Sequence, residues 1–171
     1  MRWVREPSGV VELCRGLQPA VFGALLLYCG SRDTAEELTQ ETLARVWEHW
    51  SSVSTMEHPD RWALRVAFNL AKSTFRRRRI AARSQALSAS DNTVTDPDRA
   101  SGLILRSAIA TLPPRQRAAV VLRYFNDLSV AETAIVLGCA EGTVKALTSQ
   151  AIAGLRERLD AVAFELEEHD A

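Results

Sequence analysis

Basic side chains recur along one segment of the chain at the spacing of a helix face. The segment from Arg61 to Ile80 reads RWALRVAFNLAKSTFRRRRI and contains no acidic residue. At 100° per residue its cations fall within about 60° of one another on a helix, with Asn69 and Trp62 on their flank. The cations of this basic stripe are Arg61, Arg65, Lys72, Arg76, Arg79 and, just beyond the segment, Arg83. Lysine and arginine at regular spacing follow phosphates and release counterions, so the basic stripe predicts a nucleic-acid surface.

The residues opposite the basic stripe are apolar, which predicts an amphipathic helix with a core face. They are Ala63, Val66, Ala67, Leu70 and Ala71. The charges exclude a membrane span, whereas a helix lying on a membrane surface and a merely solvated charged face remain alternatives. Trp62 could stack an unpaired base while Asn69 bonds a base edge. The alternative for Trp62 is a half-buried core aromatic.

The stretch from Ser129 to Leu159 has the pattern of a helix-turn-helix. Ser129 and Glu132 form a capping box, and Gly138 can adopt the positive φ that the turn needs. An apolar face is predicted at Val130, Ala134 and Leu137, and then at Val144, Leu147 or Thr148, Ala151, Ile152 and Leu155. The recognition helix would begin near Glu141, and its outward residues would reach a major groove. These residues are Glu141, Thr143, Lys145, Ser149 and Gln150. Any tight helical hairpin looks similar, and the pattern alone leaves that alternative open.

Another helix is predicted from Asp33 to Trp50, reading DTAEELTQETLARVWEHW. Asp33 or Thr34 can serve as its N-cap. Helical spacing predicts a core face made of Leu38, Leu43, Val46, Trp47 and Trp50. On the other side lie Glu37, Gln40, Glu41, Ala44 and Glu48. A solvated acidic face and a docking ridge for a basic protein partner both fit this side.

These segments indicate an all-α protein of two small helical domains joined by a flexible linker, the second domain containing the helix-turn-helix. The domains are predicted at residues 1–83 and 103–171, and the linker at 84–102, which reads SQALSASDNTVTDPDRASG, is small and polar. Helix breaks are expected at 30–33, 51–55, 59, 113–114, 126–127 and 138–140. The net charge is zero, but the charges are unevenly distributed. Residues 1–85 contain 13 basic and 9 acidic residues, and residues 86–171 contain 8 basic and 12 acidic residues. The basic excess favours a polyanionic partner for the first domain.

Several classes of function find little support in the sequence. Cys14, Cys29 and Cys139 form no CxxC pair, so small buried hydrophobes are a better interpretation than a disulfide or metal site. The sequence has no metal-spaced His/Cys set, phosphate loop or Ser-His-Asp arrangement, and we expect neither an enzyme nor a cofactor or metal. The longest apolar run, Ala20–Cys29, is too short to span a bilayer, and the N-terminus lacks a signal-peptide pattern. We therefore expect a cytoplasmic protein without membrane insertion.

Together the two halves resemble bacterial sigma factors of the extracytoplasmic-function class, in the sigma-70 superfamily. The resemblance covers residues 10–159 apart from the diverged linker, and its wording is most similar to an actinobacterial branch. It rests on AEELTQETLARVW (35–47), RWALRVAFNLAKSTFRRRR (61–79), LPPRQRAAVVLRYFNDLSVAETAIVLG (112–138) and EGTVKALTSQAIAGLRERL (141–159). It implies an RNA polymerase sigma factor that directs core polymerase to specific promoters and helps to open the −10 element.

The resemblance also implies a role for each surface. Glu37, Gln40 and Glu41 would dock on the β′ clamp helices of core RNA polymerase, and Leu112–Tyr124 would touch the β flap. The −10 element of promoter DNA would be bound by Arg61, Trp62, Arg65, Asn69, Lys72, Arg76 and Arg79. The −35 element would be bound by Glu141, Thr143, Lys145, Ser149 and Gln150. Many members are controlled by an anti-sigma factor, which makes such a partner a candidate here. The main alternative is a helix-turn-helix transcriptional regulator that acts without binding core polymerase.

Three positions depart from the usual pattern of this family. Ala140 stands where a small hydroxyl residue is common, Ala146 where serine is frequent, and Gln150 where arginine is frequent. Each change removes a polar or cationic group from the DNA-facing unit, and the loss of an N-cap alone typically costs ~0.5–2 kcal/mol. We therefore expect weakened binding to the −35 element.

Overall fold

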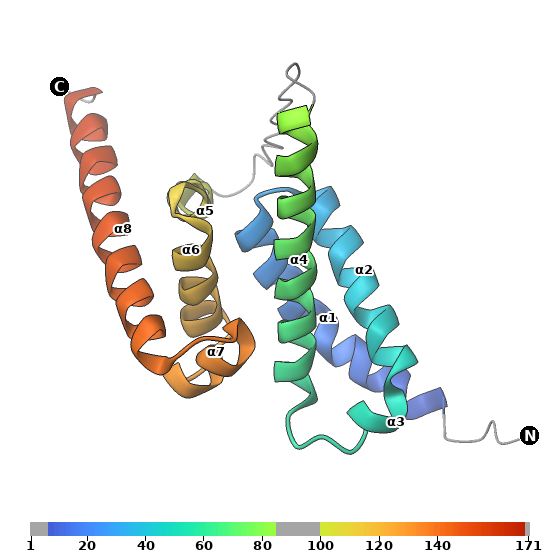
Figure 1. Ribbon diagram of the computed structural model, residues 1–171. Coiled ribbons are helices and arrows are strands. Elements are labelled where there is room, and N and C mark those ends of the chain that lie inside the picture. The colour runs from blue at the N-terminus through green and yellow to red at the C-terminus, as the bar shows by residue number, and fades with distance from the viewer. Residues whose placement is uncertain (1–6, 85–99, 170–171) are drawn as a thin grey trace, which may run out of the picture. The chain divides into compact units, whose positions relative to one another are not determined.

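The computed structural model describes residues 7–84 and 100–169, and its elements within these ranges are helices (Figure 1). The chain divides into two compact units between Val94 and Thr95, which confirms the prediction of two helical domains. The first unit holds α1 (Pro7–Cys29), α2 (Arg32–Glu48), α3 (Trp50–Val53) and α4 (Pro59–Ser84). The second holds α5 (Ala100–Thr111), α6 (Pro114–Val120), the π-helical turn η1 (Val121–Phe125), α7 (Val130–Leu137) and α8 (Glu141–His169).

Most of the expected breaks fall between these helices, but two boundaries differ from the prediction. The helix predicted to reach Trp50 ends at Glu48, and the break expected at 51–55 holds the short α3. The predicted linker falls mostly on residues 85–99, outside the described ranges. Its first residue, Ser84, ends α4, and residues 100–102 begin α5.

In the first unit, α1, α2 and α4 lie side by side and pack on one another (Figure 1). Ala63, Ala67 and Ala71 are fully buried, and their small side chains let the backbone of α4 approach its neighbours closely. The ring of Tyr28 on α1 packs against α4, with centroid distances of 5.1 Å to Phe68 and 5.9 Å to Phe75. These contacts hold one face of α4 inward and leave its other face in solvent.

The buried face of α4 is only partly the predicted one. The three alanines are buried as expected, but Val66 and Leu70 are only half-buried. Leu64 and Phe68, which the helical pattern did not select, are buried instead. The physical reason is that α4 packs against both α1 and α2, so the groove between those helices decides which side of α4 is covered.

The start of α2 corrects the predicted cap. Ser31, not Asp33 or Thr34, precedes the helix, and its hydroxyl accepts the backbone N–H of Thr34 at 3.4 Å. Thr34 is itself buried. Asp33 lies in the first turn, where its charge favours the positive end of the helix dipole.

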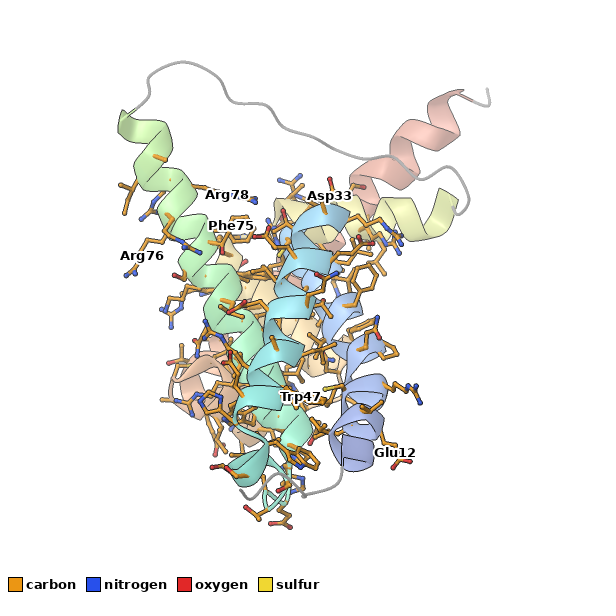
Figure 2. The ribbon with its side chains drawn as sticks, turned by 90° about the vertical axis from the view of Figure 1, so that its right-hand side faces the viewer. Glu12, Asp33, Trp47, Phe75, Arg76 and Arg78 are labelled. Carbon is orange, nitrogen blue, oxygen red and sulfur yellow. The ribbon has the colours of Figure 1, made fainter. Side chains whose placement is uncertain are left out.

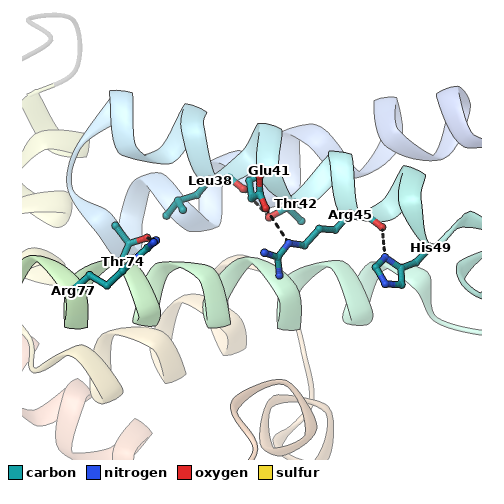
Figure 3. Close-up of polar contacts among 7 residues, drawn as sticks. All are labelled: Leu38, Glu41, Thr42, Arg45, His49, Thr74 and Arg77. Carbon is teal, nitrogen blue, oxygen red and sulfur yellow. Dashed lines mark hydrogen bonds and ion pairs between the residues drawn. The ribbon is translucent and has the colours of Figure 1, made fainter.

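The core face of α2 also differs from the prediction, because threonines form part of it. Thr39 and Thr42 are buried, and their hydroxyls donate to the carbonyls of Ala35 and Leu38 at 2.6 and 2.7 Å (Figure 3 shows the second). Leu38 and Val46 are buried as predicted, together with Ala35 and Thr34, whereas Leu43 is half-buried. Trp47 was predicted to be a core residue, but its side chain is 55% exposed.

Helix α1 qualifies the prediction about membranes. Gly9–Cys29 has the length and apolar composition of a membrane-crossing helix, and it is the single such helix among the described residues. Core helices of soluble proteins and signal sequences pass the same test, so one such helix is weak evidence of a membrane span. Val21, Ala24 and Leu25 of α1 are buried in the first unit. An uninterrupted apolar run was therefore too narrow a criterion for judging this segment.

In the second unit the helix-turn-helix forms as predicted. Ser129 and Glu132 make both hydrogen bonds of the capping box at the start of α7. Gly138 ends α7 in the left-handed conformation with a φ of 65°, and α8 then starts at Glu141. Before α7, the N–H of Asn126 donates to Val121 O at 3.2 Å, which forms the π-helical turn.

The two helices of this motif share a core with α6. Leu112, Val120 and Ala151 are buried together, and Leu155 packs against them. Val144 and Thr148 of α8 are buried, in agreement with the predicted face. On α7 Ala134 is buried as predicted, whereas Val130 and Leu137 are only half-buried. Thr133 and Val136, which the pattern did not select, are buried instead.

Two glycines near the turn should respond to substitution with opposite signs. A Cβ at Gly138 or Gly142 would meet no atom within 4 Å, so backbone conformation decides both effects. Gly138→Ala should destabilise the second unit by about 1–2 kcal/mol, because alanine disfavours a positive φ. Gly142→Ala in α8 should stabilise it by roughly 0.5–1 kcal/mol. Urea unfolding followed by circular dichroism measures both, and a loss of stability in both variants would contradict the backbone explanation.

Candidate nucleic-acid interface

All seven residues predicted to form the interface on α4 lie on that helix, but they differ in exposure. Arg61 and Trp62, in its first turns, are half-buried. The exposed residues are Arg65, Asn69, Lys72, Arg76 and Arg79. The side chain of Arg83 lies outside the described side chains. The structure thus presents one polar, cationic surface along α4, opposite the alanines that contact α1 and α2.

The four consecutive arginines do not all belong to the basic stripe. Arg78 turns back toward α2, and its Nη1 and Nη2 both donate to Thr34 Oγ1 at 3.3 Å. Figure 2 shows Arg76 pointing away from α2, while Arg78 extends toward the end of α2 that carries Asp33. Arg77 donates to Thr74 Oγ1 at 3.4 Å on its own helix (Figure 3). Arg76 and Arg79 are therefore the members of the run that extend the basic stripe.

The acidic side of α2 is exposed, as both interpretations of its pattern require. Glu37, Gln40 and Glu41 are all in solvent. Glu41 is paired with Arg45, whose Nε lies 3.0 Å from Glu41 Oε1 (Figure 3). Trp47 lies about 60° around the helix from Ala44 and about 20° from Gln40, so its exposed indole adjoins this ridge. A large exposed aromatic beside polar groups is typical of protein interfaces.

The residues predicted for the recognition helix do not share one face. At 100° per residue, Glu141, Lys145 and Ser149 lie within about 80°, whereas Thr143 and Gln150 lie at least about 100° away. Thr143 is half-buried and the other four are exposed. The side chain of Gln150 faces α6, where its Oε1 accepts Nε2 of Gln116 at 3.2 Å. The structure therefore places three of the five predicted residues on one face of α8.

A groove of about 430 Å³ runs beside Lys145 and Ser149. Arg123 and Arg156 join Lys145 in its lining, together with Val130, Thr148, Ser149, Ile152 and Ala153. Arg123 is held in place by donating to the carbonyl of Leu128. Three cations around one groove suit a phosphate backbone.

Sequence reasoning missed Arg123 and Arg156. Arg156 could have been found, because a residue eleven positions after Lys145 lies about 20° from it on a helix. Arg123 precedes α7, and only the folded motif brings it next to α8. The three cysteines, by contrast, take no part in either surface: they are half-buried, and burial raises the pKa of the Cys14 thiol.

Both domains match models of a known protein family. A family model described as "Sigma-70 region 2" matches residues 13–80, and one described as "Sigma-70, region 4" matches residues 102–155. The RNA polymerase sigma-E factor of Streptomyces antibioticus is 34% identical over 145 residues, which are 80% of this chain and 79% of that one. The ECF RNA polymerase sigma factor SigL of Mycobacterium tuberculosis is 32% identical over 136 residues, covering 74% and 75%.

The chain is a sigma-70 family sigma factor of the extracytoplasmic-function class. The resemblance noted in the sequence is thereby confirmed, including its similarity to actinobacterial members. The basic stripe of this sigma factor lies within the region 2 match as far as Arg79, and its helix-turn-helix lies within the region 4 match as far as residue 155.

Solved structures share the fold of the sigma factor. The sigma factor RpoE of Bartonella quintana, crystallised with the anti-sigma factor NepR, has a TM-score of 0.80 at 24% identity, covering 87% of this chain and 95% of that chain. CnrH, in complex with the cytosolic domain of CnrY, has a TM-score of 0.67 at 21% identity, covering 92% and 91%. At 24% and 21% identity, these likenesses show a shared fold and no more.

Proposed function

We propose that this sigma factor directs core RNA polymerase to specific promoters and helps to open the −10 element. The observation that carries the proposal is the pairing of an exposed cationic helix face in the first unit with a formed helix-turn-helix in the second. A polymerase that binds DNA through phosphates does not choose sequence, and base contacts supply that choice. We assign the chain no catalytic role of its own, and we place it in the cytoplasm, where core polymerase and promoters are found.

At the −10 element, α4 supplies both electrostatic attraction and base contacts. Arg65, Lys72, Arg76 and Arg79 would follow the phosphates, while Asn69 would bond a base edge. Trp62 would stack an unpaired base, and stacking on an aromatic is worth roughly 1–3 kcal/mol per base. This binding energy would offset the few kcal/mol that unpairing costs.

At the −35 element, α8 would enter the major groove of duplex DNA. Glu141, Lys145 and Ser149 share the face that we propose for this contact, and Arg123 and Arg156 would hold a phosphate strand along the adjoining groove. Thr143 and Gln150 lie off this face, so we propose no direct contact for either in the wild-type protein. Binding at both elements through one chain raises the effective concentration of the second contact.

Gln150→Arg should tighten binding to −35 duplex. It should also steepen the slope of log affinity against log salt by about 0.9, the contribution of one phosphate contact. In the wild-type protein Gln150 is held by Gln116, so the new arginine must turn away from α6 to reach DNA. Gln116→Ala is the matched control, because it releases residue 150 without adding charge and should leave the salt slope unchanged. Fluorescence anisotropy with a labelled duplex at several salt concentrations measures both. An unchanged affinity and slope in Gln150→Arg would refute the expectation.

For core polymerase, we propose that the exposed ridge of α2 docks on the β′ clamp helices. Glu37, Gln40 and Glu41 supply its polar groups, and Trp47 adds an apolar anchor that the sequence pattern had placed in the core. Within Leu112–Tyr124, the segment proposed to touch the β flap, Leu112 and residues 118–122 are buried. Exposed members such as Arg115 and Tyr124 are therefore the ones that can make that contact.

Trp47→Ala should weaken binding to core polymerase roughly 10-fold, because tryptophan is enriched among the residues that contribute most to interface affinity. Folding should change little, since the indole is 55% exposed. Ile135→Ala is the matched control: the residue is 60% exposed and belongs to α7 of the second unit, whereas the ridge belongs to the first. Surface plasmon resonance with immobilised core polymerase compares the two. If both variants weakened binding equally, Trp47 would not be part of the docking surface.

The proposed function is tested by run-off transcription with purified core polymerase and a pool of genomic promoter fragments, with and without the protein. Transcripts that require the protein are the expected result, and their start sites would identify both promoter elements. A helix-turn-helix alone would also suit a regulator independent of polymerase, but the chain matches sigma-70 region 2 as well as region 4. A stable dimer without affinity for core polymerase would favour the regulator, because such regulators pair on palindromes.

An anti-sigma factor is also a proposed partner. The support is that RpoE, whose fold this chain shares, was solved in complex with the anti-sigma factor NepR.

A further inference from the structure

His49 lies at the junction of α2 and α3, where its side chain is tied to the end of α2. It is the C-cap residue of α2 and directly precedes α3. Its Nδ1 lies 3.0 Å from the carbonyl oxygen of Arg45, and Figure 3 shows this contact. A carbonyl oxygen only accepts, so Nδ1 carries the proton in this contact. The backbone N–H of His49 donates to the same carbonyl at 3.0 Å, so the backbone and the imidazole are both bonded to the end of α2.

The imidazole contacts the aromatic residue that the proposed function uses. The ring centroids of His49 and Trp62 are 5.9 Å apart, with an angle of 48° between the ring planes. Trp62 belongs to the start of α4, where its backbone N–H reaches the carbonyl of His58 at 3.4 Å. Backbone bonding therefore places its Cα, whereas the orientation of its indole depends on side-chain contacts.

We propose that His49 is a positioning residue that holds the Trp62 indole ready to stack an unpaired base of the −10 element. This inference rests on the proposed function, because it assigns Trp62 to the opened promoter strand. An indole rotates about two side-chain torsions, and binding must restrict both before a base can stack. A neighbouring ring that is itself fixed restricts them in advance, so less entropy is lost on binding.

Other residues already hold the α2–α4 junction together. Val53 of α3 is buried, and so is Ala63, the residue after Trp62. His49, by contrast, is exposed and buries little surface of its own. Its replacement should therefore disturb the indole more than the stability of the unit.

Two substitutions separate the two contacts of His49. His49→Asn places an amide N–H where Nδ1 stood but removes the ring, and His49→Phe keeps a ring but removes the donor. In complex with core polymerase, His49→Asn should bind a single-stranded −10 oligonucleotide roughly 2- to 10-fold more weakly, the range expected for one side chain that must be ordered on binding. His49→Phe should lose less of this affinity, because it keeps a ring next to Trp62. The oligonucleotide is the non-template strand of a promoter found by run-off transcription.

A double-mutant cycle with Trp62→Ala tests whether His49 acts through the indole. His49→Asn should weaken binding in the wild-type background and add no further loss once Trp62 is alanine. Duplex DNA of the −35 element should bind all variants equally. An equal loss of oligonucleotide affinity in both backgrounds would overturn the inference. So would a loss of affinity that parallels a lower urea midpoint of unfolding across the variants.

A measurement without DNA checks the ring contact itself. The full chain contains four tryptophans, so labelling with 5-fluorotryptophan gives four fluorine signals, and Trp62→Phe identifies one of them. His49→Asn should move the Trp62 signal; an unmoved signal would overturn the inference. If wild-type holoenzyme failed to bind the strand, the proposed function would fail and the inference with it. A wild type that binds without coupling between His49 and Trp62 would overturn the inference alone.

Discussion

Replacement of Lys72, Arg76 and Arg79 together by glutamine should weaken promoter binding by the holoenzyme on the order of 100-fold at 0.1 M salt. All three side chains are exposed on one face of α4, in a segment without acidic residues. Each phosphate contact adds about 0.7–0.9 to the slope of log affinity against log salt, so the triple variant should flatten this slope by about 2–3. Anisotropy of a labelled promoter fragment, measured across a salt series, gives both quantities.

The arginine run itself supplies the controls for this result. Arg77 is exposed but lies about 100° around the helix from Arg76, and it bonds to Thr74. Arg77→Gln should therefore change the slope much less than Arg76→Gln. Arg78→Gln should affect the stability of the first unit, because Arg78 is held at Thr34. If Arg76→Gln and Arg77→Gln flattened the slope equally, the cations would act as a diffuse field and not as a row of contacts.

Leu25→Ala should destabilise the first unit by about 2–5 kcal/mol, the usual cost of emptying a fully buried leucine site. Leu25 is 0% exposed and lies on α1, which packs against both α2 and α4. The expected loss is a large part of a typical folding free energy of about 5–15 kcal/mol. A core that collapsed around the smaller side chain would lower the cost toward the bottom of this range.

Tryptophan fluorescence during urea unfolding measures this effect selectively. The four tryptophans all precede residue 63, so their emission reports on the first unit and not on the helix-turn-helix. Ile80→Ala is the control, because its side chain is 57% exposed and should change stability by no more than about 0.5 kcal/mol. A Leu25→Ala transition that coincided with the wild-type transition would contradict the burial of Leu25 between α1, α2 and α4.

Local chain geometry explains why much of the second unit could be predicted. The spacing of Ser129 and Glu132 produces a capping box from adjacent residues alone, and Gly138 suits the turn because it has no Cβ. Both features are present in the structure. Neither depends on distant parts of the chain, which is why the pattern sufficed.

The faces of the helices were harder to predict, and α2 shows why. An apolar pattern overlooks threonine, yet Thr39 and Thr42 are buried because their hydroxyls bond to carbonyls of their own helix. The pattern instead selected Trp47, because its helical spacing placed it with the core residues, yet its indole is exposed. Helical spacing shows which residues share a side, but the neighbouring helices decide which side is covered.

The sequence by itself determined the all-α class, the two helical units, the helix-turn-helix and the position of the basic stripe on its segment. These depend on periodicity, capping and turn residues, which act over a few residues. Only the tertiary structure decided that Arg78 turns back to Thr34, that Arg123 joins Lys145 and Arg156 around one groove, and that His49 meets Trp62. Each of these contacts joins different elements of the chain, and packing between helices sets such contacts after the local rules have been satisfied.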